Sequence, residues 1–356
     1  MRKSAHRRQI RLVCLGCCWA ALVGFSLPAT EPRLDYHLTG LVDEVLTAPT
    51  RSRAAIAAPK LERAQWRLTV DTSIVADSNV TNSTNEHSIS TFQGDLVLPV
   101  PLDPSLRAHS STGLGVAMAG GVDFSLAKDV LLTINAEGYM LDQEGETNDD
   151  VSLLMAAGPN FAWSGGEASA QLVAFERWYG GISASAGFGL RGRYKEQLAP
   201  GQNIILSVDA RVFESDYGEE FGGTQAGLYL AYNDVLNEIT TGSIGIFVRR
   251  DWLDGEAYSS RELGAYGGLS RYIGSAFTGS ITAGISTILF DAPVAFPSPE
   301  PRQDMRVYAS ASLTTRKPIG WGVHPSLGYT YNWTRSSIGF FEAQRHRLRF
   351  ALWRNY

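Results

Sequence analysis

The chain has 356 residues and a formal net charge of −5, because 36 Asp and Glu outnumber 31 Lys and Arg. This acidic balance argues against nucleic acid as a partner. Charged residues make up 19% of the chain and the mean hydropathy is −0.09. A soluble protein and a membrane β-barrel share such values, because a barrel distributes its apolar residues by alternation along its strands.

The first 29 residues predict a secretory signal peptide. Basic residues from Arg2 to Arg11 precede an apolar run from Leu12 to Leu27, a pattern typical of a signal peptide rather than a spanning helix. All three cysteines lie inside this segment, at Cys14, Cys17 and Cys18. The mature protein is therefore expected to have no disulfide and no thiolate metal site.

Residues 30–65 contain one weakly amphipathic piece, Leu38 to Leu46, followed by a mixture of Ala, Pro and Arg. A tetratricopeptide repeat needs about 34 residues and several stacked copies. We therefore interpret this segment as a periplasmic lead-in or a small plug.

Residues 66–356 predict an all-β fold, an outer-membrane antiparallel β-barrel of about 14 strands that alternate between lipid and a polar lumen. The predicted strands are 66–76, 111–125, 130–142, 150–163, 167–179, 181–194, 202–214, 224–233, 239–251, 259–273, 276–290, 303–316, 321–334 and 338–354. An even number of strands would place both ends of the barrel in the periplasm. Compact connections should then alternate with longer acidic ones that face the cell exterior, with a short turn at Gly180 as the exception.

The alternation also predicts which side chains face the lumen. In the strand over 202–214, Ser207, Asp209 and Arg211 alternate with apolar residues, so charges of both signs are expected inside. Two interpretations are open. Ion pairs and water would hold the lumen together, or the charges would shape a conduit.

The last strand alternates apolar and charged residues and ends in an aromatic residue. We expect an outer-membrane assembly signal, read by the barrel assembly machinery, at Leu348, Phe350, Leu352 and Tyr356.

No local motif indicates an enzyme, a cofactor or a metal site. The six histidines show no metal-ligand spacing, and neither a Gly-x-Ser-x-Gly elbow nor a His-Glu-x-x-His pair is present. A Gly-x-Gly-x-x-Gly match at Gly187 lies within a predicted strand, whereas phosphate binding needs a strand-to-helix turn. An outer-membrane enzyme with residues converging from distant strands is kept as a third hypothesis.

Two groups of residues resemble a known family. They are Asp77-Ser78-Asn79-Val80 after the first strand, and, near the C-terminus, Arg302-Gln303-Asp304, Arg316-Lys317-Pro318, Gly322, Pro325, Ser337-Ile338, Phe340-Phe341 and Arg345. They are similar to the C-terminal barrel of the surface lipoprotein assembly modifiers, over about residues 66–356. The chain departs from that family at Ser337, where Asn is usual, and in having no room for the usual N-terminal tetratricopeptide domain.

The resemblance implies a translocon-like barrel in the outer membrane of a Gram-negative bacterium, assisting delivery of lipoproteins or secreted proteins to the cell surface. Its partners would be outer-membrane lipids, the barrel assembly machinery and such a cargo. The alternative is a passive porin-type channel for small solutes. We expect the charges from Arg302 to Lys317 near the periplasmic side, where Arg316 and Lys317 would contact an acidic cargo segment or pin the turn.

Deleting Tyr356, or replacing Phe350→Asp, is expected to lower the amount of protein in the outer membrane, because either change damages the predicted assembly signal. The measurement is outer-membrane abundance together with heat-modifiable migration on gels. Wild-type abundance of both heat-modifiable variants would contradict this interpretation of the terminus.

Overall fold

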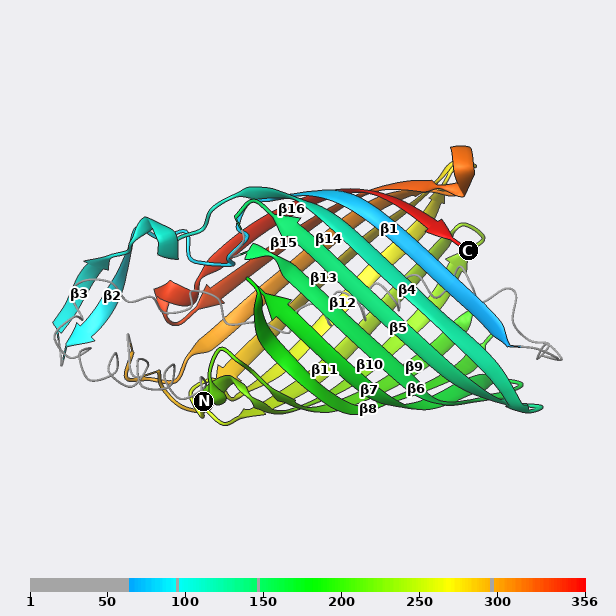
Figure 1. The fold of residues 1–356 in the computed structure, drawn as a ribbon, viewed down its shortest axis with the longest axis horizontal. Coiled ribbons are helices and arrows are strands. Elements are labelled where there is room, and N and C mark those ends of the chain that lie inside the picture. The colour runs from blue at the N-terminus through cyan, green and yellow to red at the C-terminus, as the bar shows by residue number, and fades with distance from the viewer. Residues whose placement is uncertain (1–63, 94–95, 146–147, 295–297) are drawn as a thin grey trace, which may run out of the picture.

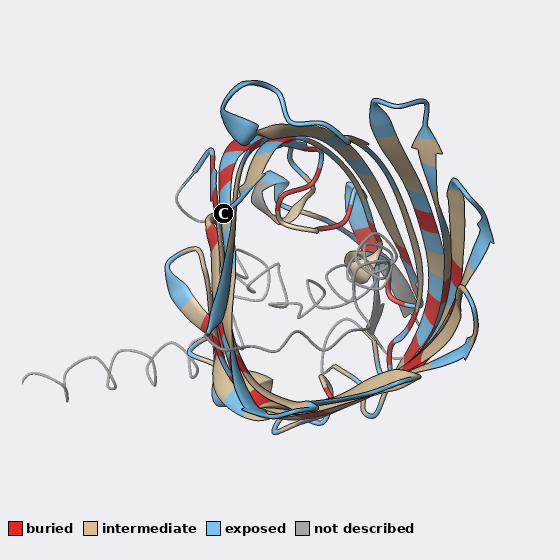
Figure 2. Cartoon of the chain, turned by 90° about the vertical axis from the view of Figure 1, so that its right-hand side faces the viewer, coloured by how far each residue is buried: buried red, intermediate tan, exposed pale blue. Residues whose placement is uncertain are grey.

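The computed structural model describes residues 64–93, 96–145, 148–294 and 298–356. Within these residues, fourteen antiparallel strands form one closed barrel in which β1 pairs with both β4 and β16 (Figures 1 and 2). The predicted signal peptide (1–29) and nearly all of the predicted lead-in (30–65) lie outside the described residues.

The barrel strands are β1 (Gln65–Asp77), β4 (Ser111–Ala127), β5 (Val130–Gln143), β6 (Asp150–Trp163), β7 (Gly166–Tyr179), β8 (Ile182–Ala199), β9 (Gln202–Glu214), β10 (Gly223–Asn237), β11 (Thr240–Leu253), β12 (Ser260–Ile273), β13 (Phe277–Phe290), β14 (Gln303–Thr315), β15 (His324–Ser336) and β16 (Ala343–Asn355). The predicted all-β barrel is therefore confirmed, with each strand close to its expected position.

Several strands differ from their predicted bounds. β8 ends at Ala199 rather than 194 and β10 at Asn237 rather than 233, so part of each predicted connection belongs to a strand. A hairpin of β2 (Ser88–Gln93) and β3 (Leu96–Pro101) stands in the long connection after β1, where we expected only a loop. The last two barrel strands begin later than predicted, because the short 3-10 turns η5 (Gly320–Gly322) and η6 (Gly339–Phe341) precede them.

The other described helices are also single turns, η2 (Pro104–Leu106) and η4 (Glu219–Phe221). No helix in the described part of the chain is long and apolar enough to span a membrane.

Connections of two kinds separate the ends of the barrel. One end, which we call the short-turn end, carries tight turns such as 128–129 and 164–165, together with the start of β1 and the end of β16. The other, the long-loop end, carries the β2–β3 hairpin and the loops 215–222 and 291–302. At the exceptional short connection, Gly180 and Gly181 have φ of 55° and 77°, the left-handed pair that a tight two-residue hairpin turn requires.

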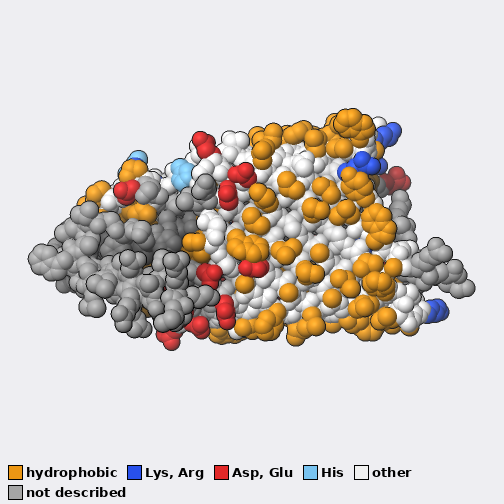
Figure 3. Space-filling view, in the orientation of Figure 1, with side chains coloured by type: hydrophobic (Ala, Val, Ile, Leu, Met, Phe, Trp, Pro, Cys, Tyr) orange, Lys and Arg blue, Asp and Glu red, His pale blue; other side chains and the backbone are white. Residues whose placement is uncertain are grey.

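The outer wall is apolar. Alternate side chains such as Leu114, Val116 and Met118 on β4 point outward and are exposed. Figure 3 shows this apolar band over the strands, with acidic side chains gathered toward the long-loop end of this face and basic ones at the short-turn end. Such a band is the surface that a barrel presents to lipid.

The inner wall is less uniformly polar than the alternation suggested. Ile205, Ala231, Phe247 and Tyr266 form a buried apolar cluster on the lumenal face of β9 to β12. Phe247 lies opposite Gly264, and Tyr266 lies opposite Gly245. A Cβ on Gly264 would fall 2.4 Å from the Phe247 ring, and one on Gly245 would fall 2.5 Å from the Tyr266 ring. Glycine at these positions therefore lets each aromatic ring lie flat on the neighbouring strand.

The arrangement of the connections predicts sidedness. Asn85 lies in the connection at the long-loop end and Leu236 lies at the opposite end, beside the turn after β10. Because the long loops of such barrels face the exterior, an epitope at Asn85 should be labelled on intact cells, whereas one at Leu236 should be labelled only after permeabilisation. The reverse pattern would mean that the barrel is oriented the other way.

Candidate functional site at the barrel seam

The first and last strands meet at the seam, which we define as the pairing of β1 with β16. The ladder runs from Thr69 opposite Asn355 to Asp77 opposite Arg347 without a break in register. At the short-turn end it is extended by the Tyr356 N–H, which donates to the Leu68 carbonyl at 2.8 Å. The seam is thus closed along its length, and no membrane-facing gap separates the two strands.

A buried ionic cluster ties the seam at the long-loop end. Asp77 is 3% exposed, and Arg345 Nε lies 3.0 and 2.9 Å from its two carboxylate oxygens. Arg347 Nε donates to the same carboxylate at 2.9 Å. We call these three residues the Asp77 clamp. Because charge-assisted hydrogen bonds are stronger than neutral ones, the clamp joins β1 to β16 by side chains as well as by backbone.

Ser78 and Asn79 continue the clamp into the loop. The Ser78 N–H donates to the His346 carbonyl at 2.9 Å, and the His346 N–H donates to Ser78 Oγ at 2.8 Å. Asn79 is fully buried, and its side-chain amide donates to the carbonyls of Ser83 and Gln344 at 2.8 and 3.1 Å. The Asp-Ser-Asn sequence therefore anchors the start of the long connection to β16.

Arg302 and Asp304 form a second buried group at the same end. The Arg302 guanidinium lies between the rings of Phe290 and Phe341, 3.7 and 3.9 Å from their centroids. Its Nε is 3.4 Å from an Asp304 carboxylate oxygen, and both residues are 2% exposed. Stacking on two rings fixes η6, which holds Phe341, against the start of β14.

Five further family-motif residues lie at the short-turn end. Arg316 stacks on Tyr272 at 4.0 Å and donates to the Gly274 carbonyl at 3.3 Å, so it holds the turn after β14 against the neighbouring turn. The other residues of this group are Lys317, Pro318, Gly322 and Pro325, of which Gly322 has a φ of +74°.

Our expectation that all these charges share the periplasmic side is wrong for Arg302 and Asp304. They precede and begin β14, whereas Arg316 follows it, and the strand crosses the whole barrel between them. The motif is thus divided between the two ends.

The predicted assembly-signal residues lie on the outside of the barrel. Leu348, Phe350 and Leu352 point outward from β16, with 49%, 47% and 38% of their surfaces exposed, and Tyr356 is 54% exposed at its end. This placement fits lipid contact, and their role in assembly stays a prediction.

The lumen contains ion pairs in which one carboxylate serves two guanidinium groups. Besides Asp77, this holds for Asp209, which pairs with Arg191 and Arg211, and for Glu262, which pairs with Arg249 and Arg306. The inward direction expected for Asp209 and Arg211 is confirmed by their burial. These networks brace neighbouring strands. The inner wall is locally positive around Asp209, whereas Arg249 also pairs with Asp251 at 3.3 Å, so the charges around Glu262 balance.

The sequence analysis did not select Arg347 as a site residue, and it noted Arg345 only within the family resemblance. Both lie on the charged phase of the last strand, so the alternation pointed to their inward direction. Their common partner Asp77 lies 268 and 270 positions away, and the alternation carries no information about that pairing. In the described residues no group of three or more His, Cys, Asp or Glu side chains could hold a metal ion.

A family model described as surface lipoprotein assembly modifier matches residues 66–356. The chain belongs to this family. It is accordingly an outer-membrane β-barrel of a Gram-negative bacterium. A comparison with curated proteins found no match.

Solved structures similar to this barrel include a Pseudomonas aeruginosa FadL homologue, with 9% identity and a TM-score of 0.45 over 83% of this chain and 90% of that one. The outer-membrane channel DcaP of Acinetobacter baumannii has 8% identity and a TM-score of 0.44, covering 83% and 99% of the two chains.

The clamp makes a prediction about stability. Replacing Asp77→Asn leaves two largely buried guanidinium groups without their carboxylate, and breaking a buried ion pair in this way costs about 3–5 kcal/mol. The free energy of unfolding, measured by urea titration in detergent, should fall by that order.

Asp123→Asn is the matched control. It removes a lumenal carboxylate that also pairs β1 with a neighbour, but at the short-turn end. Its partner Arg67 is 46% exposed, so the loss should stay below about 1 kcal/mol. An equal loss of unfolding free energy in the two variants would mean that the Asp77 clamp contributes no more to stability than a partly exposed ion pair does.

Proposed function

We propose that this protein assists the delivery of a lipoprotein or secreted protein to the cell surface, and that the seam is where the barrel opens to admit the cargo. The proposal rests mainly on one observation: two family-motif segments contact each other across the seam. The Asp-Ser-Asn motif after β1 and Arg345 of β16 are far apart in sequence, and they join in the Asp77 clamp. Membership of a family described by its role in surface lipoprotein assembly supports the same activity.

The seam suits this role because it joins the first and the last strand of the barrel, and no connection of the chain runs directly from one to the other. Every other pair of adjacent barrel strands is joined by a single connection of the chain, and for β1 and β4 this is the long connection that holds the β2–β3 hairpin. Separating β1 from β16 therefore moves no covalent connection. It exposes two strand edges whose unpaired N–H and C=O groups are costly in lipid. An extended cargo segment that pairs with either edge would replace those hydrogen bonds, as in β-strand addition.

A reversible cross-link tests whether the seam opens. Thr72 and Leu352 face each other across the seam and both point outward, at the spacing of facing residues in an antiparallel pair, which a disulfide can bridge. The chain has no cysteine after Cys18, so a Thr72→Cys, Leu352→Cys variant would carry the only pair in the barrel. With a candidate lipoprotein cargo co-expressed, oxidation should prevent exposure of that cargo to protease on intact cells, and reduction should restore it.

The control pair is Leu263→Cys with Thr287→Cys, which face each other on the outside of β12 and β13. Oxidising this pair should leave cargo exposure unchanged, because the wall there has no reason to part. If the seam disulfide forms completely and the cargo still reaches the surface, seam opening is not the route.

The second candidate is a passive channel, favoured by the two lumenal arginines, Arg191 and Arg211, that share one carboxylate at Asp209. A locally positive wall would favour anions over cations. If the cargo stays protected beside the wild-type protein, while the purified barrel gives steady anion-selective conductance in a bilayer, the channel replaces the translocon. Neither role requires catalysis, so we propose no enzymatic activity.

A further inference from the structure

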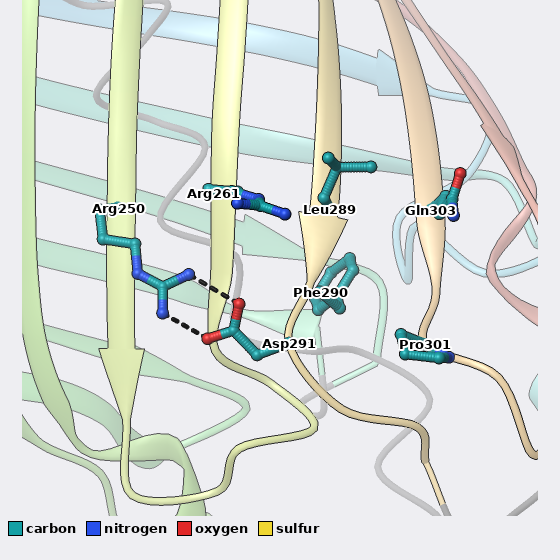
Figure 4. Close-up of a pocket in the computed structure, with 7 residues that line it drawn as sticks. All are labelled: Arg250, Arg261, Leu289, Phe290, Asp291, Pro301 and Gln303. Atoms are coloured by element: carbon teal, nitrogen blue, oxygen red, sulfur yellow. Dashed lines mark hydrogen bonds and ion pairs between the residues drawn. The ribbon is translucent and has the colours of Figure 1, made fainter.

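A row of side chains that includes two arginines crosses the outer wall at the long-loop end. Arg250 of β11 lies opposite Arg261 of β12, which lies opposite Leu289 of β13, which lies opposite Gln303 of β14. Together with Asp291 these residues line a pocket of about 740 Å³ (Figure 4). Four neighbouring strands thus contribute residues at the same height in the wall to one pocket.

The pocket has one carboxylate for two guanidinium groups. Arg250 Nη1 donates to Asp291 Oδ1 at 2.8 Å, and its Nη2 donates to the other carboxylate oxygen (Figure 4). These hydrogen bonds lower the pKa of Asp291, and the nearby charge of Arg261 adds to the effect. Arg261 itself has no ion pair within 4.0 Å among the described residues, so Asp291 offsets only one of the two charges.

Two like charges directly opposite each other on neighbouring strands destabilise the pair. Outward charges in the middle of the lipid band also cost free energy, although this cost becomes small near the interface. The positive charge that Asp291 leaves on this pair of arginines at the membrane-facing wall is therefore best explained by an anion that approaches from outside the protein.

The surroundings indicate what carries that anion. One step toward the middle of the same strands, Val248 and Leu263 point outward and are 45% and 66% exposed, so the apolar band begins directly beside the pocket. On the other side Trp252 is exposed, with its ring 5.5 Å from the Arg250 guanidinium, as expected of an aromatic residue at a membrane interface. The pocket is thus at headgroup depth.

We propose that this pocket binds the phosphate group of an outer-leaflet lipid. Arg261 and the face of Arg250 turned away from Asp291 would donate to the phosphate oxygens, since guanidinium groups match phosphate in geometry and charge. The Gln303 amide would complete the headgroup contacts, and the acyl chains would lie along Val248 and Leu263. The site is independent of the seam and of the proposed transport role.

The test is native mass spectrometry of the full-length mature barrel in detergent, titrated with bisphosphorylated lipid A. Arg261→Gln should weaken binding about tenfold, the effect of losing one or two charge-assisted hydrogen bonds. The matched control is Arg271→Gln, which removes an exposed outward arginine of the same strand at the short-turn end and should change binding less than about twofold. Heat-modifiable migration checks that each variant is folded.

Two outcomes would overturn the proposal. Equal weakening by Arg261→Gln and Arg271→Gln would show general attraction to positive charge rather than a site. Displacement of the lipid by inorganic phosphate at a concentration equal to that of the lipid would show that the pocket binds a soluble anion, because the acyl contacts would then contribute nothing.

Discussion

The structure depends on closing its first strand against its last. Within lipid every backbone N–H and C=O must find a partner inside the protein, and a row of strands can meet this requirement only by forming a ring. The ladder between β1 and β16 completes that ring. The Asp77 clamp and the side-chain hydrogen bonds of Asn79 secure it at the long-loop end, and Tyr356 extends it at the other. Any opening of the wall must offset the loss of these interactions.

Because side chains alternate along each strand, the two faces of the wall have different compositions. The outer face needs only apolar surface, so residues such as Leu114 and Leu263 are exposed to lipid. The inner face carries charge, and it pairs that charge across neighbouring strands, as Asp209 does with Arg191 and Arg211. Where it is apolar, glycines at Gly245 and Gly264 leave room for aromatic rings. These contacts join neighbouring strands on the lumenal side in addition to their backbone hydrogen bonds.

Departures from the simple pattern mark the places where we infer function. Asp77 concentrates ionic contacts at the one junction that no adjacent chain connection holds together. Arg250 and Arg261 place charge on the outer wall between Ala226 on one side and Leu289 on the other. In each case the local cost of a buried or lipid-facing charge is offset by a specific partner, within the chain for Asp77 and, in our proposal, from the membrane for Arg261.

The sequence by itself determined the strands, their number and the direction of their side chains. The two-residue period of a strand is visible in a short stretch of sequence, and every strand of the wall must keep it because one of its faces contacts lipid. It also indicated the family through Asp77-Ser78-Asn79 and the C-terminal motifs. Only the tertiary structure decided that Asp77 meets Arg345 and Arg347, that Arg302 and Arg316 lie at opposite ends, and that Arg250 and Arg261 share a pocket. These outcomes depend on strand register and ring closure, which join residues far apart in the chain and leave no periodic signal in it.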